Sequence, residues 1–145
     1  MSKLTGEHIV VLLDDSGGSP QDVSTDVESV DIPDEYDEVE MTGFSDGAHN
    51  STAGLPSFPV ELAGMFNPDA NSLYQVLAGI KGVKSGHTLT VKVGQGAAPV
   101  SGDPEFEGEF WCQKMNVSTQ PGQKIGVSTS LRVFGATAPA WGTVA

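Results

Sequence analysis

Apolar and polar residues alternate with a period of two along most of this chain, which is the pattern of half-buried β-strands. The alternation is strongest where Phe106, Phe110 and Cys112 share one side of a segment whose other side is acidic. Turn-forming residues, including 18 Gly and 9 Pro, separate the alternating segments. The segments that we expect to be strands are 8–13, 27–32, 36–41, 58–66, 88–93, 105–118 and 125–133.

One segment changes to the period of an α-helix. Asn67 is the predicted N-cap, Pro68 the first helical residue, and Gly82 follows the end. The sequence therefore predicts one helix at about 68–81 that buries one face against a sheet. The apolar residues of that face are Leu73, Val76, Leu77 and Ile80.

A long polar stretch, 42–57, joins two of the expected strands. It is far longer than the roughly two to five residues of a hairpin turn, and loops of this length in a compact domain are usually functional or disordered. In the strand before it, Val39 and Met41 alternate with Glu38 and Glu40. We expect Val39 and Met41 to point into the core and the two glutamates to face solvent.

The length of 145 residues fits a single domain, 1–145, without internal repeats. The first residues carry no strand pattern and are expected to be flexible. The last ten, 136–145, have no period either, and we expect them to form an extended C-terminal arm that contains Pro139 and Trp141.

The formal net charge is -12, and it is unevenly distributed. Residues 4–80 contain 15 of the 19 acidic residues and no Lys or Arg. Such a chain does not bind DNA by neutralising phosphates, because it lacks the cations. Solubility explains an acidic surface, and so does a surface that repels a polyanion.

No set of residues suggests catalysis or metal binding, so we expect neither an enzyme nor a cofactor or metal. His8, His49 and His87 each lack a second ligand at metal-binding spacing. The acidic "LDDSGGS" at 13–19 has the composition of a turn. Cys112 is the single cysteine and is expected to be a buried apolar residue.

No apolar run is long enough to span a bilayer, and the N-terminal run 9–13 is too short for a signal sequence. We therefore expect no membrane partner and synthesis in the cytoplasm.

The order of features resembles the tail tube (major tail) proteins of long-tailed bacteriophages. The resemblance covers roughly Ser24 to Gly135 and consists of spaced positions rather than a catalytic signature. The matching positions are Val27, Val30, Pro33, Val39, Glu40, Thr42, Phe44, Ala53, Gly54, Leu55, Leu62, Gly64 and Phe66.

This resemblance implies a mainly β fold, a two-sheet β-sandwich or half-barrel with one flanking helix. It also implies hexameric rings that stack into a tube, with tape-measure and other tail proteins as partners. DNA would pass through the lumen without specific binding. The protein would be made in the host cytoplasm and reside in the tail of the virion.

The charge pattern is consistent with that function, because a DNA channel needs a lumen without cations. Glu28, Glu38 and Glu40 are the predicted lumen-facing carboxylates. The 42–57 loop is too polar for a core, so we expect it to be an arm that reaches a neighbouring subunit or ring. The candidate arm residues are Thr42, Phe44, Asp46, His49, Asn50 and Leu55.

Three other functions remain open from the sequence. A virion decoration protein and a head-to-tail joining protein of related fold would both be structural. A carbohydrate-binding β-sandwich would use aromatic residues such as Trp111 and Trp141, although these lie on different elements.

Overall fold

The computed structural model describes residues 8–95 and 97–145. The N-terminal residues that we expect to be flexible lie outside this part of the chain. The strands are β1 Ile9–Asp14, β2 Pro20–Asp22, β3 Val27–Asp31, β4 Glu35–Glu40, β5 Ser51–Ser57, β6 Val60–Met65, β7 His87–Val93, β8 Pro104–Ser118, β9 Gly126–Val133 and β10 Ala140–Thr143, and the helix is α1 Leu73–Ile80.

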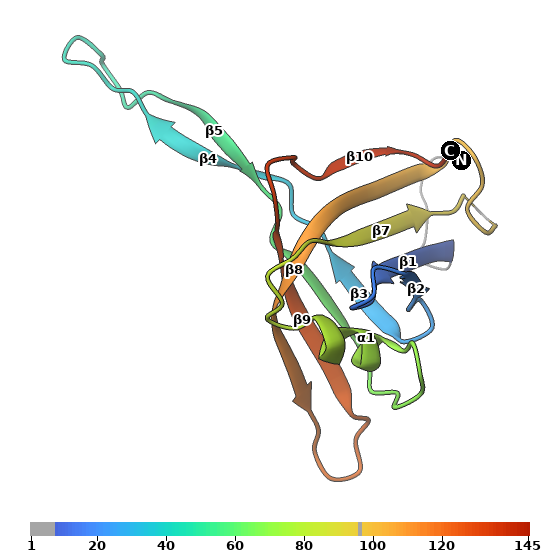
Figure 1. The fold of residues 1–145 in the computed structure, drawn as a ribbon. Helices are drawn as coiled ribbons and strands as arrows, with labels where there is room; N and C mark the ends of the chain where they lie inside the picture. Colours follow the sequence, from blue (N-terminus) through green and yellow to red (C-terminus); the bar gives the residue numbers. More distant parts are fainter. Residues whose placement is uncertain (1–7, 96) are drawn as a thin grey trace.

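One antiparallel sheet of eight strands forms the body of the molecule, in the order β2-β1-β7-β8-β9-β6-β3, with β10 added beside β8 (Figure 1). The long strand β8 connects the two halves of this sheet. Its first part pairs with β7, ending at His87↔Phe110, and its second part pairs with β9, beginning at Phe110↔Val133. The sheet curves along β8, so its halves form the two layers of a half-barrel, as the fold-class prediction requires.

The core fills the space between the two layers. Phe106 and Phe110 of β8 are fully buried there, and Cys112 is buried with them, as the alternation predicts. The helix α1 adds one apolar face to the same cluster. The buried residues of that face are Leu73, Val76, Leu77 and Ile80, as expected.

The helix begins later than the sequence predicts. Ser72, not Asn67, is the N-cap, and its side chain accepts a hydrogen bond from the backbone N–H of Gln75. Asn67 instead forms a turn, in which its Oδ1 accepts the N–H of Asp69 at 3.0 Å. The buried carboxylate of Asp26, distant in sequence, accepts hydrogen bonds from Asn67 Nδ2 and from the first helical N–H. A tertiary contact therefore sets the start of the helix.

The acidic segment 13–19 begins with the last two residues of β1, and its remaining residues, 15–19, form the turn that its composition predicts. The Asp15 carboxylate accepts the backbone N–H groups of Gly17 and Ser19. Hydrogen bonding, chiefly from the Ser19 N–H and then from the Gln21 side chain, lowers the pKa of Asp15. The turn leads into the short strand β2, which the sequence pattern does not predict.

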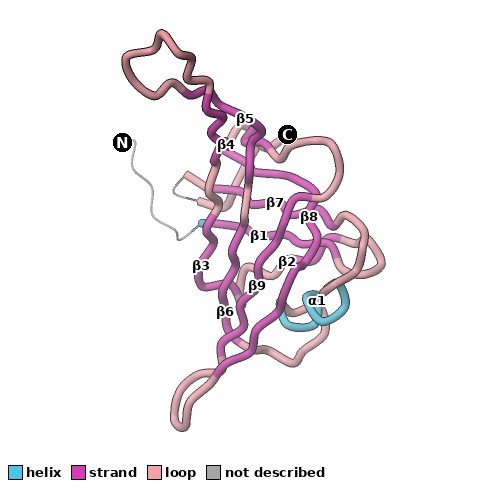
Figure 2. Tube along the Cα trace, turned by 90° about the vertical axis from the view of Figure 1, so that its left-hand side faces the viewer, coloured by secondary structure: helices cyan, strands magenta, loops and turns pink. Residues whose placement is uncertain are grey.

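The hairpin β4–β5 forms a sheet of its own and projects from the body (Figures 1 and 2). Two expectations from the sequence are therefore wrong. Residues 51–57 are a strand rather than loop, and Val39 and Met41 lie at 47% and 61% exposure instead of in the core. Both faces of the hairpin are solvent-exposed, so alternation along β4 does not indicate a buried side.

Gly64 of β6 gives the first test, because β3 passes directly over it. A Cβ at this position would lie 2.0 Å from the Asp26 carbonyl oxygen. We expect Gly64→Ala to lower the free energy of unfolding by about 2 kcal/mol, since the backbone has to move. Chemical denaturation of the purified protein measures this change.

Gly126 of β9 is the matched control, because a Cβ there meets its nearest atom at 3.8 Å. Gly126→Ala should change the unfolding free energy by less than about 0.5 kcal/mol. Equal effects of the two substitutions would contradict the close approach of β3 to β6.

Candidate functional site

The β4–β5 hairpin is inserted between two strands that already pair with each other. β3 and β6 are antiparallel neighbours, and their last register pair is Asp31↔Glu61. The chain leaves the body after this pair, runs out along β4, and returns along β5. The hairpin is therefore an extension of the β3–β6 connection rather than part of the core.

Hydrogen bonds order the tip of the hairpin. The backbone N–H of Met41 donates to the Asn50 carbonyl at 2.7 Å, and the Asn50 N–H donates to Thr42 Oγ1 at 2.9 Å. His49 Nδ1 lies 2.8 Å from a Glu40 carboxylate oxygen. The Gly43 N–H donates to Asp46 at 2.7 Å. Four of the predicted arm residues, Thr42, Asp46, His49 and Asn50, thus hold the tip in shape.

Large apolar side chains are exposed along the whole hairpin. Phe44 at the tip is fully exposed, and Leu55 of β5 is 77% exposed. Both belong to the predicted set. The exposure of Val39 and Met41 was missed because alternation assigns them to a core. Tyr36, on the side of Glu38 and Glu40, is exposed as well. Exposed apolar surface of this extent usually marks a contact with another protein.

The three predicted lumen carboxylates do not share one surface. Glu38 and Glu40 lie on the hairpin, whereas Glu28 lies on β3 in the main sheet. Glu28 forms an ion pair with Lys124, and Arg132 lies 3.7 Å from Glu61 on the neighbouring strands. On this part of the sheet, acidic and basic groups are therefore paired.

The C-terminal segment, which we expect to be an extended arm, lies along its own subunit. β10 pairs with the first part of β8, in the register Trp141↔Phe106. Pro139 is buried against Gly108, and the Trp141 ring is 5.4 Å from that of Phe106. The tail is extended, as its lack of period predicts, but β8 supplies its hydrogen-bonding partner.

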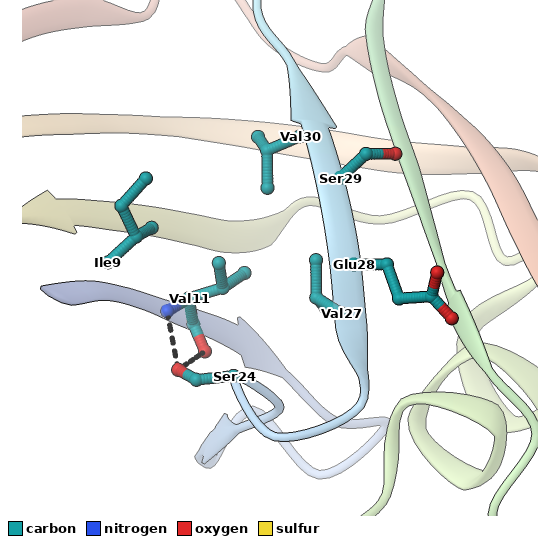
Figure 3. Close-up of a pocket in the computed structure, with 7 residues that line it drawn as sticks. All are labelled: Ile9, Val11, Ser24, Val27, Glu28, Ser29 and Val30. Carbon is teal, nitrogen blue, oxygen red and sulfur yellow. Dashed lines mark hydrogen bonds between the residues drawn. The ribbon is translucent and has the colours of Figure 1, made fainter. Parts of the chain in front are cut away.

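A cavity of about 260 Å³ opens where the half-barrel is not closed, between β1 and β3 (Figure 3). Aliphatic side chains, among them Ile9 and Val11, line it together with the polar residues Ser24 and Ser29. Ser24 Oγ accepts the Val11 N–H at 2.8 Å, so this backbone donor at the open edge is satisfied. The Glu28 side chain points away from Ile9 and Val11. The cavity does not collect groups for catalysis.

Within residues 8–95 and 97–145, no three His, Cys, Asp or Glu side chains come close enough to hold a metal ion. Burial raises the pKa of the Cys112 thiol, which makes it a poor nucleophile. In the same part of the chain, no helix has the length and apolar character needed to cross a membrane.

No protein-family model matches the sequence, and no curated protein sequence matches it. Solved structures match its fold over nearly the whole length. A chain from the tail of an empty gene transfer agent (GTA) particle, refined with C6 symmetry, has a TM-score of 0.69 at 14% identity and covers 99% of this chain and 100% of its own.

Two further matches come from injection systems. A chain from the sheath/tube terminator of the PVC extracellular contractile injection system has a TM-score of 0.72 at 13% identity, covering 98% of both chains. A chain from the tube terminating cap of the anti-feeding prophage has a TM-score of 0.70 at 12% identity, covering 99% and 93%. The fold is thus the one found in tail and tube components of such particles.

Gly108 tests the placement of the C-terminal strand. A Cβ there would lie 2.5 Å from Pro139 Cβ, so Gly108→Ala should push the tail off β8. We expect amide hydrogen exchange in β10 to accelerate about tenfold or more, because its pairing with β8 is weakened. Hydrogen-exchange mass spectrometry of residues 139–145 measures this.

Gly142 of β10 is the control, since a Cβ there has no neighbour within 4 Å. Gly142→Ala should leave the exchange rate of β10 nearly unchanged. Unchanged exchange in Gly108→Ala would argue against tight packing of Pro139 on β8.

Proposed function

We propose that this protein is a structural subunit of a tail tube, which assembles into hexameric rings that stack on one another. The observation that carries the proposal is the match in fold, over 99% of the chain, to a component of a tail with C6 symmetry. A ring also explains how the free edges of an open antiparallel sheet avoid uncontrolled aggregation, because a closed ring pairs them. The described groups support no catalytic role.

The β4–β5 hairpin is the arm that joins subunits. An isolated two-stranded hairpin is only marginally stable in water, and this one exposes Tyr36, Phe44 and Leu55. A neighbouring subunit that covers these side chains would remove their apolar surface from water and so stabilise the hairpin. Its ordered tip lowers the conformational entropy that docking costs.

The lumen conducts DNA without retaining it. The surface around Glu28 is the candidate, because Lys124 and Arg132 there are paired with Glu28 and Glu61. Paired cations contribute little to phosphate binding, and the excess of negative charge in the chain repels the duplex. Glu38 and Glu40 would face the channel only if the hairpins line it.

In this proposal the subunit is made in the host cytoplasm and resides in the virion tail, where it contacts a tape-measure protein and other tail proteins.

The similarity to a sheath/tube terminator and to a tube terminating cap supports a second candidate, a ring that ends a tube. Electron microscopy of the purified protein separates these functions. Long tubes support the tail tube, single closed rings support the ring that ends a tube, and monomers at high concentration would contradict both.

Removal of the hairpin tests its role as an arm. Because β3 and β6 pair directly, residues 34–57 can be replaced by a four-residue turn that continues this pairing. The monomer should remain folded, since shortening a loop costs little free energy and the core residue Phe58 is retained. We expect tube formation, measured by electron microscopy and sedimentation, to be lost.

The control is Gly47→Ala at the hairpin tip, where a Cβ meets no atom within 4 Å. This variant should assemble like the original protein. Normal tubes after removal of 34–57 would exclude the hairpin as the arm, while circular dichroism shows whether the monomer is folded.

Charge reversal at Glu28 tests the lumen. Glu28→Lys places a second cation beside Lys124, and Glu28→Gln leaves Lys124 without its partner. Tubes of either variant should retain a short DNA duplex at low ionic strength and release it as salt rises, more strongly for Glu28→Lys. Co-sedimentation of labelled duplex with assembled tubes measures retention.

Glu107→Lys is the control, because Glu107 lies in the first part of β8, which pairs with β7 and β10. It adds the same charge elsewhere and should not retain the duplex. Retention by Glu107→Lys but not by the Glu28 variants would place the Glu28 surface outside the lumen.

A further inference from the structure

The cations of the described residues fall into two groups. Lys92 pairs with Glu105, and Lys124 and Arg132 pair with Glu28 and Glu61. The remaining cations of residues 8–95 and 97–145 have no carboxylate of these same residues within 4.0 Å. These are Lys81, Lys84 and Lys114.

The backbone brings these three lysines together. Lys81, just after α1, forms an isolated parallel bridge with Cys112, and the Gly82 N–H donates to the Cys112 carbonyl at 3.0 Å. Lys114 follows Cys112 by two residues, and Lys84 follows Lys81 by three. All three lysines are exposed.

Exposed apolar groups lie beside the lysines. Val83, between two of them, is 40% exposed. Phe134 is also 40% exposed, and its ring lies against Gly86, two residues after Lys84. The Glu109 carboxylate borders this surface beside the same glycine, where it accepts a hydrogen bond from Thr88 Oγ1. We call Lys81, Val83, Lys84, Lys114 and Phe134 the basic patch. It combines positive charge with apolar surface, whereas the chain as a whole is strongly acidic.

The β4–β5 hairpin has the complementary properties. Residues 35–57 contain no Lys or Arg, and large exposed apolar residues lie on both of its strands. Its carboxylates are Glu35, Asp37, Glu38, Glu40 and Asp46. Of these, Glu40 contacts His49 and Asp46 accepts the Gly43 N–H. The others, Glu35, Asp37 and Glu38, lie on the exposed strand β4 and form no salt bridge with a residue that the structure describes.

We propose that the hairpin of one copy docks on the basic patch of a second copy. The hairpin points away from its own body, so its tip and strands are presented to another molecule (Figures 1 and 2). The two surfaces match in charge and also in apolar character, which favours a protein partner over a nucleic acid, whose phosphates would not cover Val83 and Phe134. Each copy has one hairpin and one basic patch, so the contact is heterologous and can close into a ring.

This inference rests on the proposed function, because it requires self-assembly, and it names the surface that receives the arm. Lys84→Glu replaces attraction by repulsion in every contact of the assembly. We expect the protein concentration needed for assembly to rise about fivefold or more. Sedimentation of assembled material over a concentration series measures this threshold.

Two variants make the test specific. Gln120→Glu/Gln123→Glu changes the net charge by the same amount in the exposed β8–β9 turn and should leave the threshold nearly unchanged. Lys84→Glu/Glu38→Lys restores both the net charge and the opposite signs, and should recover most of the lost assembly. If Lys84 only stabilised its own subunit, adding Glu38→Lys on the distant hairpin would not restore the assembly that Lys84→Glu loses.

Zero-length carbodiimide cross-linking identifies the contact directly, since it joins carboxylates only to amines that they touch. In assembled protein, peptides that contain Asp37 or Glu38 should be joined to peptides that contain Lys81 or Lys84. The joined peptides should come from different copies, which a mixture of isotope-labelled and unlabelled protein reveals.

The outcomes separate the two proposals. If the original protein assembles and Lys84→Glu assembles equally well, the docking site is wrong and the tail tube proposal stands. If Lys84→Glu assembles normally but loses binding of a DNA duplex, the patch serves nucleic acid instead. If the original protein never assembles, the tail tube proposal fails and the docking site fails with it.

Discussion

The fold depends on the pairing of β8 with different partners along its length. Residues 104–110 pair with β7 and β10, and residues 110–118 pair with β9, so one strand belongs to both layers. The buried side chains of Phe106 and Phe110 fill the space between the layers. Because Phe110 is paired with both β7 and β9, the curvature at this position determines how the two layers face each other.

The same arrangement leaves a free edge on β3 and an opening between β1 and β3. Local hydrogen bonds satisfy polar backbone groups at this opening, such as the Val11 N–H, which donates to Ser24 Oγ. Instead of ending in a tight turn, the β3–β6 pair continues into the projecting hairpin. A body with its own core and a projecting hairpin are thus produced by one connection.

The sequence predicts the body well and the hairpin poorly, for one physical reason. Period-two alternation reports burial against a core, so it locates the strands of the body and the buried side of β8. The hairpin has no core within its own chain, and the same alternation therefore places Val39 and Met41 incorrectly. Residues 51–57, with Gly54 and Pro56 among them, have weak strand propensity, and their pairing with β4 is what makes them a strand.

Contacts between residues that are distant in the sequence cannot be predicted from local patterns either. Asp26 fixes the start of a helix 47 residues later, and Glu28 pairs with a lysine 96 residues away. The resemblance positions include Gly64, whose role is clear only from the Asp26 backbone that passes over it. The same limit applies to the candidate site. The length and polarity of 42–57 predict a functional segment, but the sequence does not predict which of the hairpin side chains are exposed.

Charge acts between copies of this protein at two different distances. The net charge of -12 repels copies at a distance, which keeps the free subunit soluble. This repulsion is screened beyond about 10 Å at 0.1 M salt, whereas an acidic strand in contact with the basic patch is screened less because water is partly excluded. Since the other described cations are already paired within the subunit, the patch is the site where a second copy finds unpaired positive charge. Docking at the basic patch can therefore occur between molecules whose net charges repel each other.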